Sequence, residues 1–429
     1  MTFTTVTTKL KVNFTHLIAS KLLRAGFWLT IANVLAGMLG YAYQVLMGRL
    51  LSPVDFALFS AIMALTMFIS SPLGAMFMVV SRRVSILCAH NQFDVLRSLY
   101  WRTHKFLVLG GLFFLLLLFP FVSEVQTYLK AMTPIPIWIF GGVIVFSAFV
   151  LINNAFFQGM QFFGWLGSVG VIGVVLKIVL CYVLLTLGFG VDGALAGIFL
   201  SLGGIWLIGA VSITRRFPAK GLEGKLPVES FPWKTILPVL IANIAFAAMT
   251  QLDMVLVNWY FPSEQAGLYA AASVLGKAVL YLPGGLVMAL YPMVAENHAK
   301  DQSSAHIMFQ AVVTTFFLCA TVAIVYWFLG EWLINLLYGN AYIGAGKLLS
   351  WYGLAILPMT LVMVAEYFLI AKGRVLFAWL FLGMAPLQVL AIHFWHESMW
   401  MVIAIMGGSG STLVIIGYTM LWLDFRRVT

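Results

Sequence analysis

Four charged side chains interrupt long apolar stretches of the sequence: Lys177, Asp253, Lys277 and Glu366. A charge near the middle of a bilayer costs at least about 2.5–3.5 kcal/mol, so such a residue normally faces a polar cavity or a partner. We expect Lys177 and Lys277 to face a polar pathway, where an ammonium group attracts anions. Asp253 and Glu366 are candidates for binding a coupling ion. The alternative for Glu366 is an interfacial position, because it lies close to the end of its stretch.

Uncharged polar residues form three further groups within apolar stretches. They are Asn33 and Gln44 in the first, Asn153 and Asn154 in the second, and Asn243 and Thr250 in the third. On a helix, Asn243, Thr250 and Asp253 fall within an arc of about 80°, because successive residues are about 100° apart. We expect these stripes to line the same pathway; the alternative is hydrogen bonding between packed helices.

No enzyme signature accompanies these residues. Gly276-Lys277 and Gly346-Lys347 lack the first glycine of a phosphate-binding loop, and neither is followed by Ser or Thr. His393 and His396 lie beside Glu397, but no further ligand can be named there, so a solvated loop is expected. The sequence therefore predicts no enzyme activity, no cofactor and no metal site.

The overall composition identifies the solvent around these groups. Of 429 residues, 62% are hydrophobic and 9% charged, and the mean hydropathy is +1.02. An ordinary soluble domain carries roughly 25% charged residues, and a soluble chain of this size needs polar groups to cover its surface. Lipid is the solvent that tolerates such a surface. A soluble enzyme, a nucleic-acid-binding protein and a disordered scaffold are excluded, despite the net charge of +10.

About twelve apolar stretches are long enough to cross a membrane. All should be α-helices, because a lipid-exposed backbone must satisfy its hydrogen bonds within its own segment. The expected spans cover residues 27–48, 54–79, 106–123, 136–158, 164–187, 191–213, 235–258, 266–294, 306–329, 346–370, 375–393 and 399–422.

The basic residues indicate an orientation. Of the 24 Lys and Arg residues, Lys177 and Lys277 lie within spans; Arg49, Lys130 and Lys347 lie in one set of loops, and the other 19 lie in the opposite set. Cytoplasmic loops carry the excess of Lys and Arg in membrane proteins. We therefore expect a multi-pass protein of the cytoplasmic (inner) membrane with both termini in the cytoplasm.

The two halves of the chain resemble each other. At an offset of 210 residues, Ala32-Asn33 meets Ala242-Asn243, and Gly74 meets Gly284. Six spans per half is an even number, so the halves share one orientation, as in parallel-repeat transporters. The expected organisation is an all-α polytopic protein with two six-helix lobes around a central cavity. Its segments are an amphipathic cytoplasmic stretch 1–26, lobes 27–213 and 235–422, a cytoplasmic linker 214–234 and a tail 423–429.

Several segments resemble a known family. The stretch from Gln251 to Tyr269, continuing to Tyr291-Pro292, resembles the seventh and eighth helices of the polysaccharide transporter family. Gly48–Phe56 resembles that family's first external turn, and Leu337–Tyr342 resembles the turn before its tenth helix. The members are O-antigen and exopolysaccharide flippases of the multidrug/oligosaccharidyl-lipid/polysaccharide exporter superfamily.

The resemblance implies translocation of a lipid-linked oligosaccharide by alternating access, driven by an ion gradient. The substrate would be a polyprenyl pyrophosphate that carries sugars, and polysaccharide polymerases and glycosyltransferases would be possible partners. Lys177 and Lys277 are then the residues that would offset the pyrophosphate charge at low dielectric constant.

Two other functions fit parts of the sequence. A multidrug-extrusion antiporter would share the fold but needs acidic residues to bind organic cations. Here the charges expected deep within the spans are two lysines and one aspartate. A non-transporting membrane partner of a polysaccharide assembly complex predicts no polar stripes that converge from both halves.

Asp253 and Lys277 are expected to form an ion pair. They lie on adjacent antiparallel spans, about 10 residues before and about 14 after the turn, so their depths differ by roughly 6 Å at 1.5 Å per residue. A lysine side chain can largely cover that difference. A substrate phosphate that competed for Lys277 would release Asp253 to bind a proton or cation.

Overall fold

The computed structural model describes the chain apart from residues 1–20, 218–232, 285–293, 295–304, 373–374 and 427–429. Residues 1–20 of the amphipathic stretch expected at 1–26, most of the linker 214–234 and the end of the tail 423–429 therefore lie outside the described residues, whereas residues 21–26 belong to the first helix. The described part is helical, as expected for an all-α polytopic protein, and 11 of its helices are long and apolar enough to cross a membrane.

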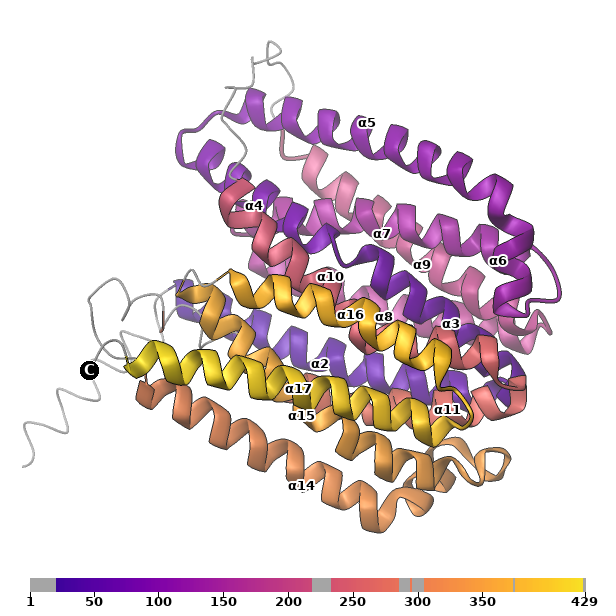
Figure 1. Ribbon diagram of the computed structural model, residues 1–429. Helices are drawn as coiled ribbons and strands as arrows, with labels where there is room; N and C mark the ends of the chain where they lie inside the picture. The colour runs from indigo at the N-terminus through magenta and orange to yellow at the C-terminus, as the bar shows by residue number, and fades with distance from the viewer. Residues whose placement is uncertain (1–20, 218–232, 285–293, 295–304, 373–374, 427–429) are drawn as a thin grey trace, which may run out of the picture.

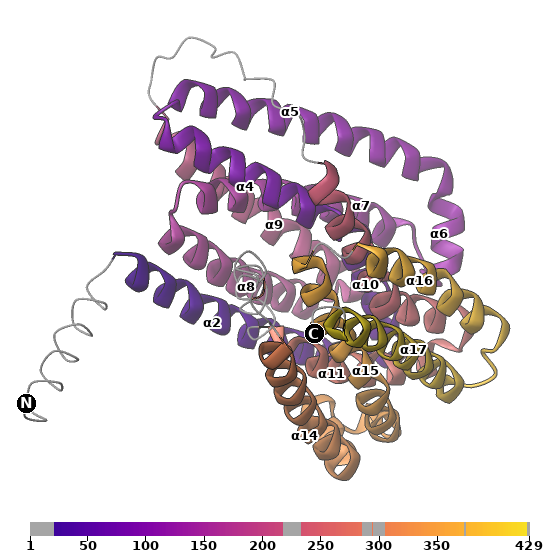
Figure 2. The same ribbon diagram turned by 60° about the vertical axis from the view of Figure 1, so that its left-hand side comes forward.

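The first lobe is built from the helices before the linker. They are α2 (Lys21–Leu50), α3 (Pro53–Ser70), α4 (Leu73–Ala89), α5 (Phe93–Leu118), η1 (Phe119–Phe121), α6 (Val122–Leu129), α7 (Ile135–Gly159), α8 (Phe163–Thr186) and α9 (Gly190–Thr214). Within this lobe α2 packs on α8, and α7 packs on α4 and α9. Figures 1 and 2 show α5 along the outside of the lobe.

The second lobe is built from the helices after the linker. They are α10 (Trp233–Tyr260), α11 (Ser263–Gly276), α12 (Ala278–Tyr281), α14 (Ala305–Tyr338), η2 (Asn340–Tyr342), α15 (Ala345–Ala371), α16 (Leu376–Phe394) and α17 (Met399–Arg426). Here α15 packs between α14 and α17, and α10 packs on α16. The lobes meet chiefly where α3 packs against α10 and α11.

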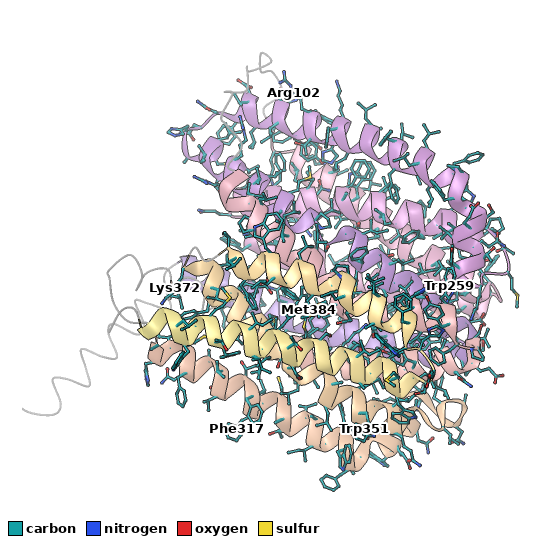
Figure 3. The ribbon with its side chains drawn as sticks, in the orientation of Figure 1. Arg102, Trp259, Phe317, Trp351, Lys372 and Met384 are labelled. Carbon is teal, nitrogen blue, oxygen red and sulfur yellow. The ribbon has the colours of Figure 1, made fainter. Side chains whose placement is uncertain are left out.

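The bundle has two ends, which we name by the chain. The near end is where α2 begins and α17 finishes; the far end is where α2 finishes at Leu50 and α17 begins at Met399. In Figure 1 the near end lies to the left and the far end to the right. Figure 3 labels Lys372 at the near end and Trp259 at the far end.

Two expected spans have other boundaries in the structure, one because a proline divides it and the other because polar residues extend the helix. The span expected at 54–79 is two helices, because α3 stops before Pro72, which has no backbone N–H to continue the ladder, and α4 then runs on to Ala89. Likewise α5 begins at Phe93 rather than at residue 106. Its first turns carry Arg and Lys, so hydropathy alone marks only the later, apolar part.

The eighth expected span, 266–294, also differs from one continuous helix. Its first part is α11, which ends at Gly276, followed by the short α12 from Ala278 to Tyr281. The residues beyond include 285–293, which lie outside the described part of the chain. This interruption places Lys277 between two helices.

Local sequence explains the far-end turn between α2 and α3. Ser52 is the N-cap of α3, and its hydroxyl oxygen accepts a hydrogen bond from the backbone N–H of Asp55. Pro53 occupies the first turn, where its missing N–H costs nothing, and the Asp55 carboxylate favours the positive end of the helix dipole. This turn fixes where α3 enters the boundary between the lobes.

Candidate functional site

An ion pair of the second lobe lies beside the boundary between the lobes. Lys277 Nζ is 3.3 Å from Asp253 Oδ1, and both residues are buried, with 8% and 0% of their surface exposed. The predicted contact between these two residues is therefore confirmed. Pairing matters here because an isolated charge buried in a low-dielectric medium is strongly destabilising.

Two tyrosines complete the surroundings of the carboxylate. The hydroxyls of Tyr269 on α11 and Tyr352 on α15 both donate to Asp253 Oδ2, at 3.0 and 2.9 Å. One carboxylate thus joins three helices of the second lobe through three donors. Sequence reasoning missed both tyrosines, since Tyr352 lies 99 positions from Asp253 and no local pattern marks it.

The ammonium of the pair borders a cavity of about 100 Å³ between the lobes. Its lining comes from both halves of the chain: Tyr41, Gln44, Ser60, Met63, Ala64, Met67, Gln251, Met254, Ser273, Val274, Lys277 and Tyr281. Lys277 Nζ also donates to Gln251 Oε1 at 3.4 Å, and Tyr41 donates across the boundary to the Val274 carbonyl at 2.8 Å. Lys277 lines the cavity while Asp253 lies behind it, so the site presents a cation to whatever enters.

Gln44 and Lys277 are the predicted residues that the structure brings to one cavity. Asn33, on the same stripe as Gln44, is exposed on α2 and does not line it. Asn243 on α10 is half-buried and lies beside Gly74 of α4, where the lobes also approach each other. Thr250 is buried and donates to the carbonyl of Phe246 one turn earlier in its own helix.

Lys177 lies elsewhere. Its ammonium sits over the ring of Tyr43, 4.1 Å from the ring centroid. Tyr43 is two positions after Tyr41, which lines the cavity, and is therefore about 200° further around α2. The structure thus places Lys177 and Lys277 on opposite sides of α2, and the pathway role of Lys177 stays a prediction.

Asn153 and Asn154 lie inside the first lobe. Asn153 accepts from the Tyr100 hydroxyl at 3.0 Å and donates to the Trp206 carbonyl at 2.9 Å, which joins α5, α7 and α9. This is the interhelical bonding that was the alternative for the polar stripes. The side-chain oxygen of Asn154 is buried without a hydrogen-bond partner in the described part of the chain.

Glu366 is buried in α15, five residues before the helix ends at Ala371, with 4% of its surface exposed. At the far end, the Tyr260 hydroxyl forms a hydrogen bond with His393 Nδ1. The Tyr260 ring stacks on the ring of His396, with 3.9 Å between the ring centroids. Within the described residues, no three His, Cys, Asp or Glu side chains gather where they could hold a metal ion.

Polar contacts join the lobes at the far end. Lys130, after α6, donates to the carbonyl of Phe261 at 2.6 Å, and Arg49, at the end of α2, donates to the carbonyls of Leu336 and Leu337 near the end of α14. Partial burial lowers the pKa of Lys130. Carbonyls at helix C-termini lack intrahelical partners and carry negative dipole charge, so cations suit them. Two cations of the first lobe thus bind helix ends of the second.

Further bonds follow the same boundary at the far end. Asn258 donates to the Leu129 carbonyl at 2.9 Å, and the Tyr342 hydroxyl donates to the Leu51 carbonyl at 3.3 Å. A Cβ added to Gly267 of α11 would lie 2.1 Å from the Pro53 carbonyl oxygen, so the two lobes touch here backbone to backbone. The described conformation is closed at this end.

A two-lobed bundle of membrane helices with a charged pair at its central cavity defines the class of protein: a multi-pass membrane transporter. A family model described as "Polysaccharide biosynthesis protein" matches residues 22–298, and a model named MatE matches residues 238–394. The chain belongs to the polysaccharide biosynthesis protein family, as the sequence resemblance implied.

Solved structures share the fold at low sequence identity. An inward-facing multidrug resistance MATE family transporter of the MOP superfamily is 12% identical, with a TM-score of 0.75, over 92% of this chain and 95% of that one. The lipid II flippase MurJ, in an inward closed conformation, is 16% identical, with a TM-score of 0.69, over 93% and 89%. An outward-facing MATE family transporter is 15% identical, with a TM-score of 0.64, over 94% and 96%. No curated protein is similar enough in sequence to count as a relative.

Proposed function

We propose that this protein is a flippase that moves a lipid-linked oligosaccharide, anchored by a polyprenyl pyrophosphate, across the cytoplasmic membrane by alternating access. The observation that carries the proposal is the ion pair at the central cavity, which turns the ammonium of Lys277 toward the space between the lobes. The membership in a polysaccharide biosynthesis family supports a glycan as the cargo.

The substrate phosphate would compete with Asp253 for Lys277. The carboxylate would then keep its two tyrosine donors on Oδ2 while Oδ1 became free. A buried carboxylate with one open oxygen favours binding of a proton or a cation, because burial penalises its charged form. The exchange of one partner for another would couple ion to substrate, with Asp253 as the ion site and Glu366 as a second candidate.

The described cavity is too small for the cargo. Its volume of about 100 Å³ has room for several water molecules. An oligosaccharide therefore requires the lobes to separate. Because the far end is closed by polar contacts, separation would begin at the near end.

We assign the near end to the cytoplasm. The split of basic residues between the loops supports this orientation. Reporter fusions test it: fusions after Thr429 and at Thr133 should report opposite sides, and the same side for both would overturn the assignment. Glycosyltransferases would supply the substrate at one face of the membrane, and polymerases would consume it at the other.

The test of function is Lys277→Ala. Glycan export, measured by labelling sugars at the cell surface, should be lost while the abundance of the protein stays close to wild type. Lys277→Arg should restore part of the export, because a cation returns to the cavity. Lys347→Ala is the matched control, since this lysine lies in a far-end groove away from the pair. Intact export in Lys277→Ala would remove the phosphate-binding role.

Multidrug extrusion is the second candidate, because the MatE model matches part of the chain. An organic cation would have to displace Lys277 from Asp253 and would meet a like charge in the cavity. The site therefore favours an anionic substrate. Drug resistance conferred by the wild-type protein, and lost in Asp253→Asn, would reverse this preference.

A further inference from the structure

A second hollow, of about 430 Å³, opens between the lobes toward the near end. It is formed by α4, α5 and α10, and we call it the seam groove. Helices α4 and α5 belong to the first lobe and α10 to the second, so the groove crosses the boundary. Its lining includes Ala75, Val79, Arg102, Phe106, Ile236 and Leu240.

The seam groove lies in the half of the bundle nearest the near end. Leu240 is seven residues after the start of α10, which at 1.5 Å per residue corresponds to about 11 Å along the helix. Figure 3 labels Arg102 on the part of α5 closest to that end. Asn243 and Gly74 lie close to the lining residues of the groove in sequence, and α10 and α4 approach each other there.

The chemistry of the seam groove is that of an amphiphile. Arg102 is its charged lining residue and is exposed, whereas the other lining side chains are apolar apart from Thr103. A hydrocarbon chain gains little by moving from lipid into an apolar groove, because lipid is equally apolar. Affinity and selectivity must therefore come from Arg102, whose planar guanidinium binds phosphate through two parallel hydrogen bonds.

We propose that the seam groove binds the prenyl chain of the lipid-linked substrate as it enters from the near end, with Arg102 at the phosphate next to that chain before the pyrophosphate moves on to Lys277. This inference rests on the proposed flippase function and adds the path of the lipid. The sugars would enter the space between the lobes, while the tail stayed at the lipid-facing seam. Because the groove is shared by α4, α5 and α10, its width would change as the lobes move.

The experiment uses the full chain, purified and reconstituted in phosphatidylcholine nanodiscs. The probe is a fifteen-carbon prenyl monophosphate with a photoreactive group at the end of its tail. After illumination, mass spectrometry should find label on peptides of α4, α5 and α10. Val79→Trp and Leu240→Trp, which fill the groove from opposite lobes, should each reduce this labelling about tenfold or more, since bulky side chains exclude the tail. Arg102→Gln should weaken binding about tenfold through loss of the charged hydrogen bonds.

Leu112→Trp is the matched control, because Leu112 is 59% exposed on α5 and does not line the groove. It should label as wild type does. Unchanged labelling in both groove variants would overturn the proposal. So would equal displacement of the probe by phosphatidylglycerol and by unlabelled prenyl phosphate, which would make the groove a general site for anionic lipids.

The same probe separates this inference from the proposed function. It carries no sugar, and its binding requires no transport, so Lys277→Ala should be labelled as wild type is. Loss of export in Lys277→Ala without groove labelling of the wild type would remove the lipid path and leave the flippase. Groove labelling together with normal export by Lys277→Ala would support the lipid path and remove the role of the ion pair.

Discussion

The two ends of the boundary between the lobes are built differently. At the far end, Arg49 and Lys130 of the first lobe donate to backbone carbonyls of the second, and Gly267 lets α11 touch the backbone at Pro53. Toward the near end, the apolar seam groove lies between α10 and the helices α4 and α5. One end is closed by directional hydrogen bonds and close backbone approach, whereas an apolar hollow lies between the lobes toward the other.

This difference gives a meaning to the basic residues that break the charge rule. Three cations, Arg49, Lys130 and Lys347, lie at the far end, which we propose faces away from the cytoplasm and where the rule then predicts few. Two of them, Arg49 and Lys130, bind helix ends across the boundary. The third, Lys347, lines a groove with Glu331 and Trp351 within the second lobe. Arg49 and Lys130 therefore differ from Lys347 in that they bind the opposite lobe, and this contact, not charge alone, is what would hold the far end closed.

The reaction rate of a single cysteine in the central cavity can report whether the far end is open or closed, and the predictions below all use it. Ser60 lines the central cavity and is buried. A cysteine at Ser60, in a chain whose 3 natural cysteines are replaced, should react slowly with a membrane-impermeant maleimide added at the far side. Opening of the far end should raise that rate in proportion to the population of open molecules.

The largest effect is expected from Gly267→Ala. The added Cβ would lie 2.1 Å from the Pro53 carbonyl oxygen, and overpacking of this kind costs about 3 kcal/mol, so the labelling rate should rise about 100-fold. Gly74→Ala, at the near-end approach of the lobes, is the matched control, because its Cβ would meet Asn243 at an ordinary 3.6 Å. Equal rates in the two variants would show that the ends do not differ as described.

A smaller effect is expected from Arg49→Ala combined with Lys130→Ala. Both cations are exposed at the surface, so their bonds to carbonyls contribute only about 1 kcal/mol each. Their joint loss should raise the labelling rate about 30-fold. Lys347→Ala removes a far-end charge without touching the boundary and should leave the rate unchanged. A rise in that variant equal to that of the double variant would point to net charge as the cause.

The smallest effect is expected from Tyr342→Phe. This change removes one neutral hydrogen bond, from the tyrosine hydroxyl to the Leu51 carbonyl, while it keeps the buried ring. A single bond of this kind contributes about 1 kcal/mol, so the labelling rate should rise about fivefold. Tyr326→Phe, which removes a comparable bond within the second lobe, should not change it.

The ion pair shows how far sequence reasoning reached into the site. The rise per residue of a helix placed Asp253 and Lys277 at similar depths on adjacent spans, and the structure joins them at 3.3 Å. Lys177 is predicted to face the same pathway because it lies deep in an apolar stretch, but its ammonium lies over Tyr43, on the other side of α2. Hydropathy indicates how deep each of these charges lies in the membrane. Only for Asp253 and Lys277, which lie on consecutive spans, does the connection along the chain also indicate that their helices are neighbours.

The sequence by itself determined the solvent and the helical class of this protein. Apolar stretches of about 20 residues admit only helices in lipid, because every backbone group must bond within its own segment. The tertiary structure alone decided that Tyr352 reaches Asp253, that Arg49 reaches the end of α14 and that Gln44 shares a cavity with Lys277. Helical periodicity predicts which residues share a face of a helix, but not which other helix that face meets. That choice depends on how many similar apolar surfaces pack together.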